Sequence, residues 1–123
     1  MTVGTAIAID KGADAPEPNA SSEELLEAAR STYEFHKALY ENGRGPTPED
    51  LYVWSKRWMA AERDLNPAAG EVATALKAHA ERMDQLEAST RARNEAGRAH
   101  GGDVTAAKYY STEAKLMLAR TGD

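Results

Sequence analysis

The sequence of 123 residues contains no cysteine and few of the residues that build β-sheets. Without cysteine the chain cannot form disulfides, cysteine-ligated zinc sites or a thiol nucleophile. Phenylalanine, isoleucine and valine together number only seven, and β-branched and aromatic residues are the ones that favour strands. We therefore expect no buried sheet, and the length corresponds to a single domain.

An excess of basic residues and long apolar runs are also missing. The formal net charge is −5, whereas nucleic-acid-binding proteins usually carry a basic patch, so we expect no nucleic-acid partner. The longest segment without a charged side chain is residues 1–9. A membrane-spanning helix needs about 20 apolar residues, and this segment also lacks the basic start and apolar centre of a signal peptide. We expect no membrane span, and a cytoplasmic location for the sequence as given, or a periplasmic one if a signal peptide was removed.

What the sequence does contain is alanine, its most frequent residue, together with leucine, glutamate, lysine and arginine. These are the strongest helix formers, so the expected class is all-α. Residues 1–20 carry two prolines among small and acidic residues and predict a disordered leader. The run Ser21-Ser22-Glu23-Glu24, with a serine followed three residues later by glutamate, then marks a helix start. The predicted helical domain covers residues 21–121.

Residues 22–42 predict an amphipathic helix. Its inward positions recur at spacings of four and three, opposite a charged stripe; they are Leu25, Ala29, Thr32, His36, Leu39 and Gly43. This repeat is close to that of a coiled coil. Gly43 supplies the left-handed conformation that ends a helix.

Three more helices are predicted. Thr47 caps the second helix and Pro48 takes its first position, and the dipeptide at 66–67 interrupts or kinks the chain after it, because proline removes a backbone hydrogen bond. The expected inward residues of this helix are Leu51, Trp54, Trp58, Ala61 and Leu65.

The third helix is predicted to cover residues 68–96. Its expected inward residues are Val72, Leu76, His79, Met83, Leu86 and Thr90. The last begins at Asp103 and turns inward Val104, Ala107, Tyr110, Ala114, Met117 and Leu118.

The two halves of the chain are similar to each other. The segment from Tyr40 to Arg44, followed by Asp50, recurs as Asn94 to Arg98, followed by Asp103. The offset between the copies is nearly constant, since it changes by a single residue across the turn. Each copy alone could not bury its apolar face. We therefore predict an antiparallel four-helix bundle made of two repeated helix–Gly-turn–helix hairpins.

This unit resembles the coiled-coil repeat of the TolC-type outer-membrane efflux proteins over residues 22–120. The residues that carry the resemblance are Tyr40, Gly43, Asp50, Leu51 and Ala61, then Gly97, Asp103, Val104 and Ala114. The family implies an envelope location, trimeric helical tubes and a role in transport. This chain has no membrane strands and is too short for a tube. The resemblance therefore indicates a helical module of the same build, a partner or relative of envelope or efflux systems.

Nothing in the sequence indicates catalysis. The carboxylates lie in patterns that support solvent-facing helix surfaces, no glycine-rich phosphate loop follows a strand, and no Glu-x-x-His pair is present for a di-iron centre. We expect a non-enzymatic protein-interaction or scaffolding module without a cofactor. The third helix is longer than the first, so Val72 and Leu76 would protrude uncovered. A second copy would cover them, which predicts a homo-oligomer.

A small soft-metal carrier is the alternative function. His79 and Met83 lie one helical turn apart on the same face, and folding the last helix back places Met117 opposite Met83. An imidazole and two thioethers suit Cu(I), so the predicted metal would be copper. The other interpretation of these residues is that they fill gaps in an alanine-rich core.

Two further groups have both a functional and a structural interpretation. Arg44 and Arg98 each follow a turn glycine, and with Arg93 and His100 nearby they could bind an anion or an acidic partner, or they could compensate helix dipoles. The first hairpin should also bring large side chains together, with 35 opposite 58 and 39 opposite 54. These residues, Phe35, Leu39, Trp54 and Trp58, would line a ligand cavity or form core.

Overall fold

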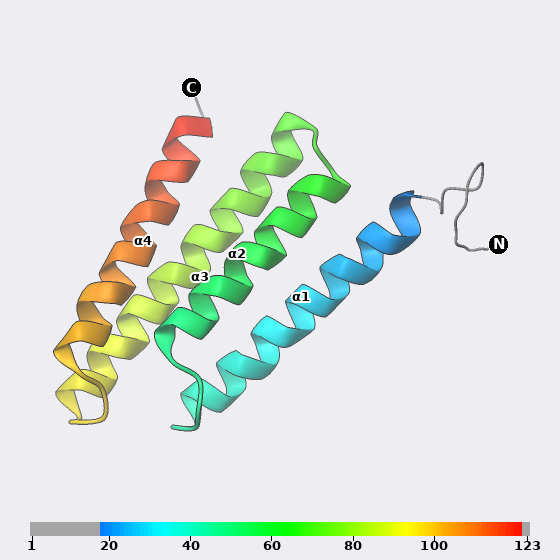
Figure 1. Ribbon diagram of the computed structural model, residues 1–123. Helices are drawn as coiled ribbons and strands as arrows, with labels where there is room; N and C mark the ends of the chain where they lie inside the picture. The colour runs from blue at the N-terminus through cyan, green and yellow to red at the C-terminus, as the bar shows by residue number, and fades with distance from the viewer. Residues whose placement is uncertain (1–17, 122–123) are drawn as a thin grey trace.

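The computed structural model describes residues 18–121, which form four helices joined by short turns. The helices are α1 (Pro18–Glu41), α2 (Pro48–Leu65), α3 (Ala69–Glu95) and α4 (Gly101–Thr121). Consecutive helices run antiparallel (Figure 1), and no strand occurs within the described range. The prediction of an all-α antiparallel four-helix bundle is confirmed. Most of the expected leader, residues 1–17, lies outside the described residues.

The helices are arranged with α2 and α3 between α1 and α4 (Figure 1). α1 packs mainly on α2 and α4 mainly on α3, while α2 also contacts α3 and α4. α1 reaches α3 through long side chains, as in the hydrogen bond between the hydroxyls of Tyr40 and Thr90 (2.9 Å). α1 is therefore an edge helix with a large free surface.

The start of α2 is fixed by the cap that the sequence predicts. The backbone N–H of Asp50 donates to the Thr47 hydroxyl (3.3 Å), and the backbone N–H of Thr47 donates to the Asp50 carboxylate (2.8 Å). Pro48 occupies the first turn, where its missing N–H is not needed. The other helix starts differ from expectation. α1 begins at Pro18 and α4 at Gly101, so Ser21 and Ser22 lie inside a helix.

Two glycine corners close the hairpins at the same end of the molecule (Figure 1). Gly43 and Gly97 have φ values of 75° and 77°, as helix-ending glycines do. The N–H of Arg44 donates to the Leu39 carbonyl (2.8 Å), and that of Arg98 donates to the Arg93 carbonyl (2.7 Å). The two corners thus share one geometry, while a duplication of the whole hairpin stays a prediction.

The turn at Asn66 and Pro67 separates α2 from α3 completely. α2 ends at Leu65, Asn66 caps it with its N–H on the Glu62 carbonyl, and α3 begins only at Ala69. Of the two outcomes expected there, an interruption or a kink, the structure shows the interruption.

The core agrees with the predicted stripes of α3 and α4, but only in part with that of α1, where Ala29 is buried as predicted. Leu76, His79, Met83, Leu86 and Thr90 of α3 are buried, as are Ala107 and Ala114 of α4. On α1 the predicted inward residue Leu25 is 60% exposed, whereas Tyr33 and Tyr40 are buried. The tyrosines bring more apolar area than Leu25, and Tyr40 also finds a polar partner in Thr90. The helix is therefore rotated by about one residue from the predicted orientation.

Two consequences of the predicted packing are wrong. Phe35 does not meet Trp58: it is 64% exposed, and the ring of Tyr33 lies beside Trp58 instead, at 5.7 Å. Leu76 does not protrude, because it is 2% exposed and packs with Met59 and Ala75 in a second hydrophobic cluster. The overhang that predicted a homo-oligomer is therefore absent at Leu76.

Candidate functional site

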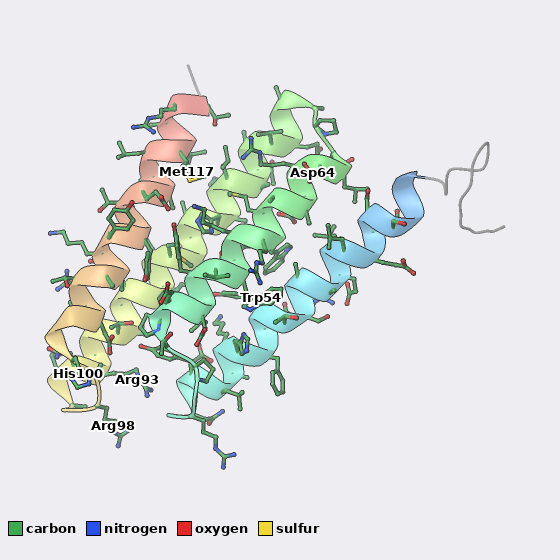
Figure 2. The ribbon with its side chains drawn as sticks, in the orientation of Figure 1. Trp54, Asp64, Arg93, Arg98, His100 and Met117 are labelled. Carbon is green, nitrogen blue, oxygen red and sulfur yellow. The ribbon has the colours of Figure 1, made fainter. Side chains whose placement is uncertain are left out.

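Three of the four predicted anion-binding residues line one cleft at the glycine corners. Arg44 follows the end of α1, Arg93 lies in the last turn of α3, and Arg98 follows Gly97. The cleft has a volume of about 200 Å³ and is also lined by Tyr40, Thr47, Pro48, Ala99 and Asp103. Figure 2 shows Arg93, Arg98 and His100 at this end of the molecule. His100 is near the cleft but is not among its lining residues. We call this feature the corner cleft.

Arg93 connects the two corners. Its guanidinium lies 4.5 Å from the centre of the Tyr40 ring, and Tyr40 is itself buried and bonded to Thr90. A Cβ added to Gly43 would lie 3.8 Å from an Nη atom of Arg93. The side chain therefore reaches from α3 across to the α1 corner and is held there by an aromatic face.

The positive charges of the corner cleft have no ion-pair partner among the residues that the structure describes. Within residues 18–121, no carboxylate forms an ion pair with Arg44, Arg93 or Arg98. Asp103 is the acidic residue among those that line the cleft, and its carboxylate accepts the backbone N–H of His100 (3.4 Å). Three arginines and one aspartate thus line a solvent-accessible hollow.

A second feature is the outer face of α1. Small and apolar side chains recur there at spacings of three and four, beside the buried face that carries Tyr33 and Tyr40. They are Leu25, Ala28, Thr32, Phe35 and Leu39. Leu25 and Phe35 are among the most exposed large hydrophobic residues of the described chain. We call these five residues the outer stripe of α1.

A buried polar network between α2 and α3 was not predicted from the sequence. Arg82 Nε donates to the Ser55 hydroxyl (2.7 Å), and this hydroxyl lies 2.7 Å from His79 Nδ1. Arg82 also donates to the Ser55 carbonyl (3.2 Å) and stacks 3.9 Å above the Trp58 ring. Because the Ser55 oxygen accepts a hydrogen bond from Arg82, the Ser55 hydroxyl donates its own hydrogen bond to Nδ1 of His79. The neutral imidazole of His79 therefore carries its proton on Nε2.

Burial keeps His79 neutral. Desolvation, and then the positive charges of Arg82 and Lys56, lower its pKa to about 4. Burial also lowers the pKa of Arg82. Ser55 and His79 have a hydroxyl–imidazole contact of the kind that activates a nucleophile, but both side chains are completely buried. We therefore interpret the network as structural.

The predicted copper ligands are distributed over two hydrophobic clusters. Met83 is fully buried in the cluster that contains Tyr33 and Leu86, whereas Met117 packs against the cluster of Met59 and Leu76. Figure 2 labels Met117 on α4. Nδ1 of His79 is hydrogen-bonded to the Ser55 hydroxyl, and Nε2 has no hydrogen-bond partner among the described residues. No group of three or more His, Asp or Glu side chains suited to a metal occurs in the described range.

Copper binding stays a prediction. The measurement that decides it is an anaerobic Cu(I) titration of the wild type and Met83→Leu. Saturable binding that Met83→Leu weakens would support the carrier. The absence of tight binding, or equal binding by the variant, would remove it.

The aromatic residues of the first hairpin form contacts that were not predicted. Trp54 lies beside His36, at 6.4 Å between ring centres, and the Arg57 guanidinium lies 4.5 Å from its ring. Trp58 and Tyr33 line an open groove of about 250 Å³ between α1 and α3. Trp54 and Trp58 are partly buried against the main core cluster, which agrees with their interpretation as core.

Within residues 18–121, no helix has both the length and the apolar character that a membrane span requires. Comparison with known protein families, with curated proteins and with solved structures gives no significant match for the chain. The resemblance to the TolC-type repeat therefore stays a prediction from its motif, and the function has to be argued from the surfaces described above.

Proposed function

We propose that this protein is a non-enzymatic helical interaction module that pairs with a second copy of itself along α1. The observation that carries this proposal is the outer stripe of α1, where Leu25 is 60% and Phe35 is 64% exposed. Burying a leucine or phenylalanine side chain contributes roughly 1.5–3 kcal/mol. An uncovered apolar stripe of this kind is typical of a surface that contacts another protein.

The apolar part of α1 is wider than its own neighbours cover. Ala29, Tyr33 and Tyr40 face the core, and the outer stripe lies beside them around the helix. The spacing of the outer stripe, three and four residues in alternation, is the spacing of a helix that packs along another helix. α1 is at the edge of the bundle (Figure 1), and Leu25, Ala28 and Phe35 are exposed there, while Thr32 and Leu39 are half-buried.

A second copy fits the stripe because the stripe is nearly symmetric about Thr32. In an antiparallel pair with Thr32 at the two-fold axis, Leu25 lies opposite Leu39 of the other copy. In the same register Phe35 lies within one residue of Ala28 of the other copy, whose small side chain leaves room for the ring. Ser31 and Ala38 flank the stripe without charge, so the two helices can approach closely. Because one helix of each copy forms the contact, we expect a weak dimer that dissociates on dilution.

The test is light scattering over a hundredfold range of concentration for the wild type and Phe35→Ser. We expect the wild type to dimerise at the high end and Phe35→Ser to remain monomeric, since it loses the largest side chain of the stripe. Tyr109→Ser is the matched control: Tyr109 is 61% exposed on α4, the opposite edge helix. A wild type that stays monomeric throughout, or a Tyr109→Ser variant that dissociates equally, would disprove the proposal.

Cross-linking tests the geometry of the pair. The chain has no cysteine, so Thr32→Cys introduces a single thiol at the proposed two-fold axis. We expect rapid disulfide-linked dimers under mild oxidation. Thr112→Cys, on the exposed surface of α4, is the control. Equal cross-linking rates for the two variants would show that α1 does not mediate pairing.

A further inference from the structure

We propose that the corner cleft is a binding site for a phosphomonoester group, held by the guanidiniums of Arg44, Arg93 and Arg98. This site is independent of the α1 contact proposed above. It lies at the end of the bundle that carries the two glycine corners.

The charge of the cleft matches this ligand. Three arginines and one acidic residue, Asp103, are among the residues that line it, and none of the three arginines forms an ion pair within the described chain. A phosphomonoester carries between one and a half and two negative charges near neutral pH and has three acceptor oxygens. The planar fork of arginine donates two parallel hydrogen bonds to such oxygens. A single carboxylate would offer less charge and fewer acceptors to the same three residues.

The backbone and one side chain are arranged before any ligand arrives. Arg44 and Arg98 each follow a glycine with positive φ, and each donates its own N–H to a helix carbonyl, at 2.8 and 2.7 Å. Arg93 stacks on the buried ring of Tyr40. A guanidinium held on an aromatic face loses less conformational entropy on binding than a free one.

Asp103 restricts the kind of phosphomonoester. Its carboxylate lines the cleft and would repel a second anionic group, but it would accept a hydrogen bond from a hydroxyl or an ammonium. The cleft, at about 200 Å³, is open to solvent beside the exposed Arg44 and Arg98. The ligand class is therefore a phosphomonoester with a neighbouring donor, either a small hydroxylated phosphate ester or a phosphoserine residue.

The experiment is an NMR titration of the labelled protein with inorganic phosphate, against potassium chloride at equal ionic strength. We expect saturable shifts of the Gly43 and Gly97 amides with phosphate and not with chloride. Arg93→Gln should weaken binding about tenfold, the effect of losing one charge-assisted contact. The double variant Arg44→Gln and Arg98→Gln, whose side chains are exposed, should weaken binding further and keeps the test valid if Arg93→Gln fails to fold.

The matched control is Arg120→Gln, an exposed arginine near the end of α4, which should bind phosphate as the wild type does. Equal weakening by Arg120→Gln, or shifts that chloride reproduces, would show unspecific charge attraction and overturn the site. Tighter binding of citrate than of phosphate would overturn the choice of ligand. A comparison of glycerol phosphate with a phosphoserine peptide then identifies which source of the phosphate ester binds more tightly.

Discussion

His79 is a completely buried imidazole whose Nδ1 is bonded to Ser55 and whose Nε2 has no partner among the described residues. Arg82, three residues further along α3, is positively charged and shares the same Ser55 hydroxyl. A charge on His79 would therefore add to that of Arg82 in the core, where neither residue forms an ion pair with a carboxylate of the described chain. This arrangement makes the protonation of one residue a determinant of stability.

We predict that acid destabilises the fold through His79. Its pKa is lowered from 6.5 to about 4, so between these values the unfolded chain binds more protons than the folded one, and stability falls as pH falls. Between pH 7 and pH 5 the loss is about 2 kcal/mol by linkage. Urea unfolding at the two pH values measures it. His79→Gln, which cannot titrate, should lack this loss over the same interval, and an equal loss in both proteins would contradict the assignment.

The sequence predicted only part of this network. It placed His79 on the inward face of its helix, and the structure agrees. Ser55 was missed, although Leu51, Ser55 and Met59 follow one another at four-residue spacing and are all buried. The two tryptophans of α2 define a competing stripe, and large aromatic side chains outweigh a serine in any hydrophobic pattern. Only the partner on α3 explains why a polar residue is buried there.

At the scale of the helix, the sequence predicted those helix ends that depend on a turn glycine or on a capping hydrogen bond. Gly43 and Gly97 were expected to end α1 and α3, and both have the left-handed conformation. The cap of α2 at Thr47 was expected as well, and its hydrogen bonds are present. These features depend on residues within one turn of each other. Contacts with distant parts of the chain are not needed to fix them.

We predict that the corner glycines contribute to stability through backbone conformation alone. Gly97→Ala should destabilise the protein by about 1 kcal/mol, because a Cβ is unfavourable at positive φ, although no atom lies within 4 Å of the added Cβ. Gly70→Ala is the control. Gly70 lies in α3, has equal space and has no positive φ, so the change should stabilise by about 0.5 kcal/mol. Thermal unfolding measures both, and the same sign of change for the two variants would refute the prediction.

The orientation of α1 was not predictable from its own sequence. Its apolar positions cover a wide arc, and the predicted stripe through Leu25 and the observed one through Tyr33 and Tyr40 lie beside each other. The choice depends on α2 and α3, which supply the ring of Trp58 and the hydroxyl of Thr90 as partners. Because the tyrosines take the core, Leu25 and Phe35 are left on the surface, where they form the proposed interface.

At the scale of the whole molecule, the repeat pattern predicted that both glycine corners lie at one end, and the structure places them there (Figure 1). This is why Arg44 and Arg98, far apart in the sequence, line one cleft with Arg93. His100 was expected with them and lies outside the lining residues. It is the residue before the first turn of α4, where it serves the helix start: its backbone N–H is bonded to Asp103.

The two proposed surfaces use different residues, so we predict that they can be removed separately. Phe35→Ser adds no charge and lies on the outer stripe, so it should abolish dimerisation and leave the phosphate-induced shifts of Gly43 and Gly97 unchanged. Arg93→Gln should weaken phosphate binding about tenfold and leave the dimer intact, since Arg93 lies on α3 and contacts Tyr40 on the inward face of α1. Light scattering and NMR titration of both variants test this. If either variant abolished both properties while keeping its helical circular dichroism, the surfaces would be coupled and the assignment of separate sites would be wrong.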